Sequence, residues 1–214
     1  MSTAARPVAA RSMTRVGEAN VGRILDGALM VFARLGFAGA RIDRIAEAAG
    51  LSKANLLYYF RSKEELYLAV LTRTLEMWLE PLRELDAGRN PEEALGRYIE
   101  KKLAYSRSHP EASRLFAMEI MQGAPMLSRV LATDLALLVE RKVATIERWT
   151  QQGKLAPVDP HHLIFTIWAT TQHYADFAAQ IRTLTGQDLG DDTFFEATRR
   201  SVKGIILNGV LPRR

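Results

Sequence analysis

The spacing of apolar residues is the feature that most limits how this chain can fold. From position 21 the apolar side chains step along the sequence by four, three, four and three residues, at Val21, Leu25, Ala28, Phe32 and Leu35. This spacing places them on one face of an α-helix. Similar runs, separated by Pro or Gly, continue to the end of the chain, and the alternation typical of strands is missing from the sequence. We therefore predict an all-α fold of nine helices.

The breaks between the runs set the expected helix boundaries. Gly36 is placed to end the first helix, and Ser52 and Ser62 are placed as N-caps of the third and fourth. The helices are expected over residues 21–35, 42–49, 53–60, 63 to the break at 88–91, that break to 108, 110–122, the break at 123–125 to about 152, 160–179 and 191–208.

Composition restricts the chemistry and the compartment. The 214 residues are 48% hydrophobic and include no cysteine. Disulfides, thiol nucleophiles and cysteine-ligated metals are therefore excluded, which fits a reducing cytoplasm. The longest charge-free apolar stretch, residues 160–175, is too short for a bilayer span of about 20 residues, so no membrane association is expected.

Positive charge is concentrated at the N-terminal end. Residues 1–62 hold nine basic and four acidic side chains, a surplus that equals the net charge of +5 of the whole chain. A localised basic surface attracts a polyanion such as DNA, although a basic end also arises by chance in small proteins.

Residues 42–60, IDRIAEAAGLSKANLLYYF, carry the functional signal. They predict a helix, a tight turn at Gly50 and a second helix, with Ala46 and Ala49 small enough for the two helices to cross closely. The second helix would enter a DNA major groove. An ordinary helical hairpin with a solvated face is the alternative, and the basic surplus over the same residues favours DNA.

The longer segment FARLGFAGARIDRIAEAAGLSKANLLYYFRSKEELY resembles the DNA-binding domain of TetR-type transcriptional regulators. The resemblance implies a cytoplasmic, nucleoid-associated homodimer on a palindromic operator. It implies a helix-turn-helix domain over residues 20–62 and a ligand-binding and dimerisation domain over 63–214. Residues 1–19, which are rich in Ala, Arg, Ser and Thr and carry no helical stripe, are expected to form a flexible basic arm. Two positions depart from the family pattern, since Arg41 replaces a capping Thr or Ser and Leu57 replaces a Tyr.

Polar side chains cluster around the second helix of the motif. Asn55 is the expected base-reading residue, because its amide can pair with adenine, and the others are expected at or near phosphates. The predicted DNA-binding residues are Arg41, Ser52, Lys53, Asn55, Tyr58, Tyr59 and Lys63.

The C-terminal segments HPEASRLFAMEIMQGAPML, QGKLAPVDPHHLIFTIWATTQHYADFA and IILNGVLPR resemble a branch of the same family that responds to pyrimidines, which implies uracil or thymine as effector. Trp168 and Gln172, four residues apart, would share one helix face, where an indole can stack on a flat ring and an amide can bind its edge. Trp78 and Met118 are weaker candidates for ligand contact. All four could instead be ordinary core residues, and another small apolar or aromatic ligand is the alternative effector.

Two other classes of function compete with a regulator. An enzyme is disfavoured because His162 and His173 lie about 16 Å apart along a helix and cannot share a metal, and no catalytic motif is found. Glu119 is expected to pair with an Arg such as Arg114. No catalytic residue, metal or cofactor is predicted. The second competing class is a scaffold protein, which would not need a basic region with a helix that fits a DNA groove.

A dimer interface is expected on the last two helices. Each carries an apolar stripe that could face either a partner or the chain's own core. The stripes consist of Ile164, Ile167 and Thr171 on one helix and Phe194, Val202 and Ile205 on the other.

Overall fold

The computed structural model describes residues 15–212, and every regular element in that range is helical. The chain divides into an N-terminal unit, residues 1–69, and a C-terminal unit, residues 70–214. Of the arm expected over residues 1–19, positions 1–14 lie outside the described residues. Residues 15–19 are the first residues of a helix, so the arm prediction is wrong for them.

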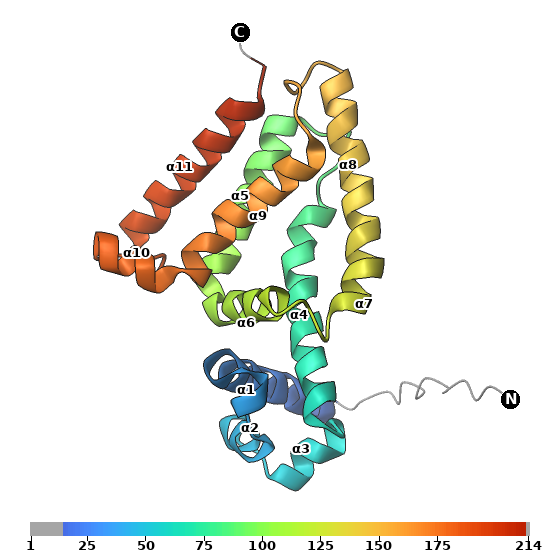
Figure 1. Cartoon of the computed structure of the whole chain (residues 1–214), viewed down its shortest axis with the longest axis vertical. Coiled ribbons are helices and arrows are strands. Elements are labelled where there is room, and N and C mark those ends of the chain that lie inside the picture. Colours follow the sequence, from blue (N-terminus) through green and yellow to red (C-terminus); the bar gives the residue numbers. More distant parts are fainter. Residues whose placement is uncertain (1–14, 213–214) are drawn as a thin grey trace, which may run out of the picture. The chain divides into compact units, whose positions relative to one another are not determined.

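Three helices and the start of a fourth form the N-terminal unit (Figure 1). They are α1 (Arg15–Gly39), α2 (Ile42–Ala48), α3 (Lys53–Tyr59) and α4 (Lys63–Arg83), of which α4 continues past the unit boundary. Gly36, at φ 66°, interrupts the regular part of α1 at the place predicted for its end, and a further turn follows it. The core of this unit consists of side chains with no exposed surface, namely Ile24, Ala28, Phe32, Ile45, Leu56 and Leu66.

Glycine allows α1 and α2 to pack at very short range. A Cβ added at Gly27 would lie 2.9 Å from the Ala49 backbone nitrogen and 3.1 Å from the Ala48 carbonyl carbon. Gly50, at φ 65°, takes the left-handed conformation that turns the chain from α2 towards α3. Ala49, which was expected to permit a close crossing of α2 and α3, thus lies against a glycine of α1, a contact that the sequence did not predict.

Besides the rest of α4, the C-terminal unit contains α5 (Pro91–Ser108), α6 (Pro110–Met121), α7 (Ser128–Val130), the π-helical turn η1 (Leu131–Leu135), α8 (Ala136–Gln151), α9 (Pro160–Asp176), α10 (Ala178–Thr185) and α11 (Asp192–Val210). In this unit α5 lies against both α9 and α11 (Figure 1). Three helices have side-chain N-caps: backbone N–H groups in the first turn of α5, α9 and α11 donate to the side chains of Asn90, Asp159 and Asp191. Pro is the first residue of α5, α6 and α9.

The helix count differs from the expected nine in two places. The helix expected from the break at 123–125 to about 152 is divided into α7, η1 and α8, because five residues take the wider π conformation. The helix expected over 160–179 stops at Asp176 and a new one, α10, begins at Ala178. Non-helical geometry at Phe177, with φ −112° and ψ 28°, produces that break.

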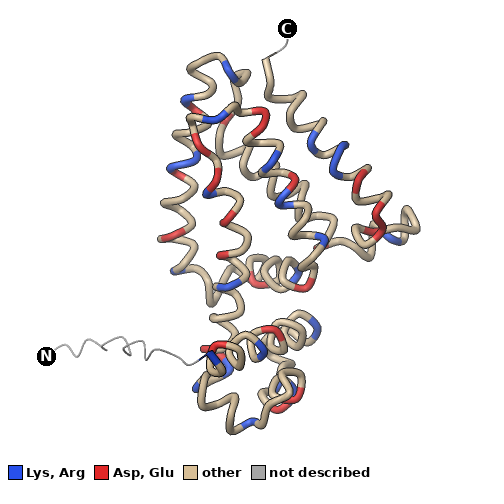
Figure 2. Tube along the Cα trace, turned by 180° about the vertical axis from the view of Figure 1, so that it is seen from behind, with Lys and Arg blue, Asp and Glu red and all other residues tan. Residues whose placement is uncertain are grey.

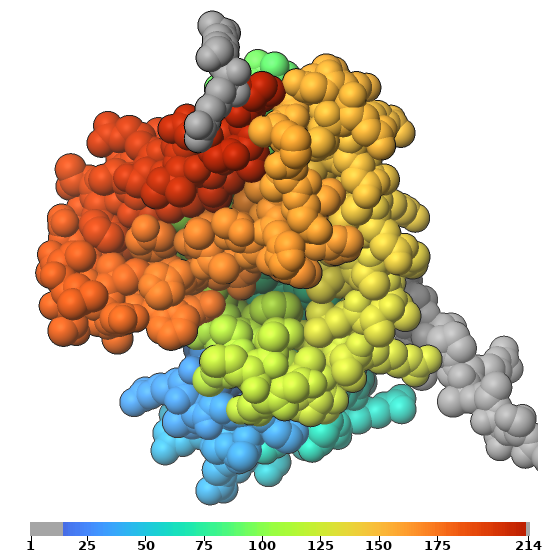
Figure 3. Space-filling model, turned by 45° about the horizontal axis from the view of Figure 1, so that its top comes forward, coloured from blue at the N-terminus to red at the C-terminus, as the bar shows by residue number. Residues whose placement is uncertain are grey.

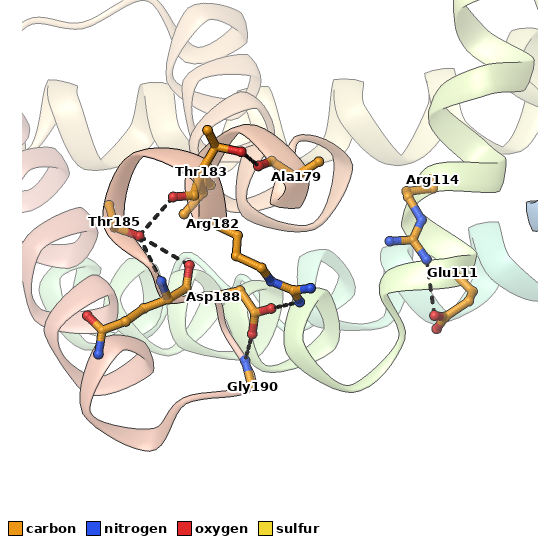
Figure 4. Close-up of polar contacts among 10 residues, drawn as sticks. Glu111, Arg114, Ala179, Arg182, Thr183, Thr185, Asp188 and Gly190 are labelled. Atoms are coloured by element: carbon orange, nitrogen blue, oxygen red, sulfur yellow. Dashed lines mark hydrogen bonds and ion pairs between the residues drawn. The ribbon is translucent and has the colours of Figure 1, made fainter.

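The loop after α10 is fixed by polar contacts of its own (Figure 4). Arg182 on α10 forms an ion pair with Asp188, which also accepts a hydrogen bond from the Gly190 backbone at 2.7 Å.

Figure 4 also shows Arg114 of α6 paired with Glu111 at 3.1 Å. Glu119, which was expected to pair with an Arg, accepts backbone N–H groups of Met126 and Leu127 at 2.6 and 3.1 Å.

Most of the expected dimer residues belong to the core of the C-terminal unit. Ile164, Ile167, Thr171 and Val202 are buried within the unit, and Phe194 packs against Tyr174 with ring centroids 6.3 Å apart. The assignments of Ile164, Ile167, Thr171 and Val202 to a dimer interface are wrong, because these side chains are buried within the unit, where α9 and α11 pack against α5. Phe194 is half-buried and Ile205 is 74% exposed, so these two remain available to a partner.

The close crossing predicts the effect of one methyl group. Gly27→Ala should lower the free energy of unfolding by about 1–3 kcal/mol, since the new Cβ meets backbone atoms that cannot rotate away. Gly22→Ala is the matched control on the same helix, where a Cβ meets nothing within 4 Å and Ala is the better helix former. Chemical denaturation followed by circular dichroism measures both. Equal midpoints for the two variants would contradict the close approach.

Candidate nucleic-acid interface and effector site

Five of the seven predicted DNA-binding residues lie within residues 52–59, at the N-cap of α3 or along it, while Arg41 precedes α2 and Lys63 begins α4. Ser52 caps α3, with its Oγ accepting a hydrogen bond from the Asn55 backbone at 3.1 Å. Lys53 is exposed, Asn55 is half-buried, and Tyr58 is 75% exposed. The exposed side of α3 therefore presents a hydroxyl, an ammonium, an amide and a phenol, all of which can contact phosphates or base edges.

Asp43 holds two of the basic side chains of this surface. Lys53 Nζ lies 2.9 Å from Asp43 Oδ1, and Arg41 Nη2 lies 3.4 Å from Asp43 Oδ2. Lys53 first and Arg41 second lower the pKa of the Asp43 carboxyl below its ordinary value. Figure 2 shows acidic positions between the basic ones along this unit. A DNA phosphate that binds Lys53 or Arg41 must therefore compete with Asp43.

Two predicted phosphate contacts have partners inside the protein. Lys63 is half-buried and donates to the carbonyl oxygens of Phe37 and Ala40 at 2.9 and 3.2 Å, with its ammonium 4.4 Å from the Phe37 ring centroid. Tyr59 is half-buried and accepts a hydrogen bond from Asn20 Nδ2 at 3.1 Å. Both residues stabilise the unit, so a role at phosphates would be additional to that one and stays a prediction.

In the C-terminal unit, α5 and α9 run parallel and share two polar contacts one turn apart. Trp168 Nε1 donates to the Tyr98 hydroxyl at 2.6 Å, and Lys102 Nζ donates to Gln172 Oε1 at 3.3 Å. Burial raises the pKa of Tyr98 well above its ordinary value. Trp168 and Gln172 therefore share one side of α9, as predicted, but both meet polar partners on α5.

The predicted residue Trp78 lies next to Lys102. It is buried on α4, and the Lys102 ammonium lies 3.7 Å from the centroid of its ring. Asp176, one turn after Gln172, accepts a hydrogen bond from Ser113 Oγ at 2.5 Å. Met118 is half-buried on α6, the helix that also carries Ser113. We name Trp78, Lys102, Ser113, Gln172 and Asp176 the polar cluster.

The sequence reading missed Lys102, although a signal for it was present. Leu95, Ile99, Lys102 and Ser106 follow the helical spacing of four, three and four residues, which places Lys102 on the buried side of α5. It is only 2% exposed. A lysine within an apolar stripe is rare enough to mark a site, because burying an ammonium is costly.

Comparison with known proteins decides the family. Residues 24–70 match the model for bacterial regulatory proteins of the tetR family, and residues 71–213 match the model for the C-terminal region of YcdC-like proteins. The chain belongs to the TetR family of transcriptional regulators. It is therefore a DNA-binding regulator and not an enzyme.

Curated relatives match nearly the whole chain. The HTH-type transcriptional regulator RutR of Escherichia coli K12 is 52% identical over 190 residues, which cover 89% of this chain and 90% of RutR. The transcriptional repressor SCO4008 of Streptomyces coelicolor is 28% identical, with 88% and 96% of the two chains covered. Both are regulators of transcription by name.

Solved structures show the same fold. AibR, solved with isovaleryl coenzyme A and operator DNA, is 18% identical, with 87% of this chain and 97% of AibR covered at a TM-score of 0.68. A TetR-family regulator from Marinobacter aquaeolei VT8 is 22% identical, with 94% and 100% covered at a TM-score of 0.70. In the described part of this chain, no helix is both long and apolar enough to cross a bilayer, and no group of side chains is suited to hold a metal ion.

The position of Asp43 predicts its effect on DNA. Asp43→Asn should tighten binding to duplex DNA several-fold at low salt and steepen the salt dependence, because Lys53 and Arg41 become free for phosphates. The control is Glu92→Gln, which makes the same change in net charge at an exposed position of α5. Fluorescence anisotropy with labelled duplexes at several salt concentrations measures both. An equal effect of the two substitutions would show that only net charge matters.

Proposed function

We propose that this TetR-family regulator binds a palindromic operator as a homodimer and responds to a pyrimidine, uracil or thymine. The contact that best supports the effector is the one between Gln172 and Lys102, because it places an amide and an ammonium together beside the hydrophobic core of the C-terminal unit. The resemblance of the C-terminal segments to pyrimidine-responsive regulators supports the same ligand. We also propose that the protein acts in the cytoplasm, at the chromosome.

For the DNA contacts, we propose that α3 reads the major groove. Asn55 would read a base, while Ser52, Lys53, Tyr58 and Arg41 would contact phosphates. Exposure supports this division for Lys53, Tyr58 and Arg41. Tyr59 and Lys63 would add contacts at the edge of the surface, beyond their bonds within the unit. As domains, we propose residues 20–62 for DNA and 63–214 for ligand and dimerisation.

The effector can influence DNA binding through α4. Trp78 of the polar cluster lies on α4, whose first residues, Lys63 to Ala69, belong to the N-terminal unit. A ligand that prefers one conformation of this helix changes operator affinity by that preference and by no more.

A direct experiment measures operator binding and uracil binding together. The operator is first selected by the wild-type protein from a pool of random duplexes. We expect saturating uracil to change its affinity, and Gln172→Ala to weaken uracil binding by roughly ten- to a hundredfold through loss of the amide contacts. Gln180→Ala, which alters an exposed amide on α10, is the control.

Each outcome of that experiment bears on a different part of the proposal. Equal operator affinity with and without uracil would refute a uracil response. Unchanged uracil affinity in Gln172→Ala would remove that residue from the site and leave the regulator assignment intact.

For the homodimer, we propose that α9 and α11 form the interface. They lie side by side on one face of the C-terminal unit (Figure 3), and each carries an exposed apolar side chain, Phe165 at 47% and Ile205 at 74%. A two-fold dimer would present two α3 helices to the two halves of a palindrome.

Charge placed on this face should separate the subunits. Ile205→Asp is expected to shift the protein from dimer to monomer at micromolar concentration, since an unpaired carboxylate would be buried in the interface. Met121→Asp, equally exposed at 74% on α6, should leave the dimer intact. Light scattering measures the mass of each. A wild-type monomer, or a dimeric Ile205→Asp protein, would count against this interface.

A further inference from the structure

Lys102 is a buried cation without a matching anion. Its side chain is 2% exposed, and its ammonium contacts the Gln172 amide oxygen at 3.3 Å and the Trp78 ring at 3.7 Å. No carboxylate of the described residues forms an ion pair with it. Neither an amide oxygen nor an indole ring carries the full charge that would balance an ammonium.

The surroundings disfavour this charge. Burial lowers the pKa of Lys102 well below its ordinary value, and the carboxylate of Asp176 opposes that effect only in part. Asp176 is committed to Ser113, and burial raises its own pKa. A methionine would fill the same space at less cost, since an unpaired buried charge destabilises a fold. Lys102 therefore lowers the stability of the fold, so packing alone does not explain why a lysine occupies this position.

A second buried donor points in the same direction. Trp78 Nε1 is buried and has no hydrogen-bond partner among the described residues. An unsatisfied indole N–H costs free energy unless a ligand or water accepts its hydrogen bond. Within one cluster, the chain thus presents an ammonium and an indole N–H that both require an acceptor atom.

We propose that Lys102 and Trp78 form the oxygen-binding end of the effector site and bind a carbonyl or carboxylate oxygen of the ligand. This inference rests on the proposed function, in which the C-terminal unit binds a small-molecule effector. Trp78 acts through its N–H, which is buried without a partner among the described residues, while the ammonium covers one face of its ring. Gln172, which contacts Lys102, adds an amide beside the same oxygen.

The pair Lys102→Met and Lys101→Met tests the proposal. Lys101 is the adjacent lysine on α5, and it is partly exposed and paired with Glu84 and Glu80. The probes are uracil, with two carbonyl oxygens, benzoate, with a carboxylate, and toluene, with no acceptor. Thermal shift and isothermal titration measure their binding to the full-length protein.

We expect Lys102→Met to weaken binding of any oxygen-bearing probe at least tenfold, and Lys101→Met to leave it unchanged. Lys102→Met should also melt at the same temperature as wild type or higher, because a buried unpaired charge has been removed. A residue needed only for folding would instead lower both stability and binding. Trp78→Phe keeps an aromatic ring beside the ammonium and removes the N–H, so it should weaken binding of the same probes several-fold. If Lys102→Met does not fold, unchanged probe binding by Trp78→Phe would overturn the proposal.

The probes separate this inference from the proposed function. Binding of benzoate but not uracil, lost in Lys102→Met, would overturn pyrimidine sensing and support the oxygen-binding role. Equal uracil binding by wild type and Lys102→Met would overturn the role of Lys102 and leave pyrimidine sensing standing. Binding of toluene alone, or of none of the three probes, would overturn both.

Discussion

The parallel packing of α5 against α9 is the constraint on which the C-terminal unit depends. Two hydrogen bonds one turn apart, between Trp168 and Tyr98 and between Gln172 and Lys102, fix the register of the two helices. A third contact, from Ser106 Oγ to the Thr171 carbonyl at 2.9 Å, lies in the same seam. Sliding either helix by one residue would leave these buried polar groups without partners, at a cost of about 1–3 kcal/mol each.

This register has consequences for both proposed roles of the unit. It uses the main apolar stripes of α9 and α11 for the core, so a partner subunit can meet only the residues that remain exposed, such as Ile205. It also brings Lys102 to Trp78 and Gln172, three residues from three different helices. The same packing that stabilises the unit therefore defines its polar cluster.

The N-terminal unit combines two opposing demands on its charged residues. Basic side chains must be available to DNA, and an isolated unit is more stable when they are paired. In the structure, Asp43 pairs with Lys53 and Arg41, and the carbonyl oxygens of Phe37 and Ala40 accept hydrogen bonds from Lys63. Ion pairs at such exposed positions are weak, so in the proposed DNA contacts phosphates replace Asp43 as the partner of Lys53 and Arg41.

The sequence by itself determined the fold class, the helix-turn-helix and its family. Those features are local, since the apolar spacing, the caps at Ser52 and Ser62 and the turn at Gly50 each depend on a few neighbouring residues. The tertiary structure alone decided which apolar stripes are core, that Gly27 must be small, and that Lys102 meets residues far along the chain at Trp78 and Gln172. A periodic pattern shows that a helix face is buried but not what covers it, because the covering surface comes from residues distant in sequence.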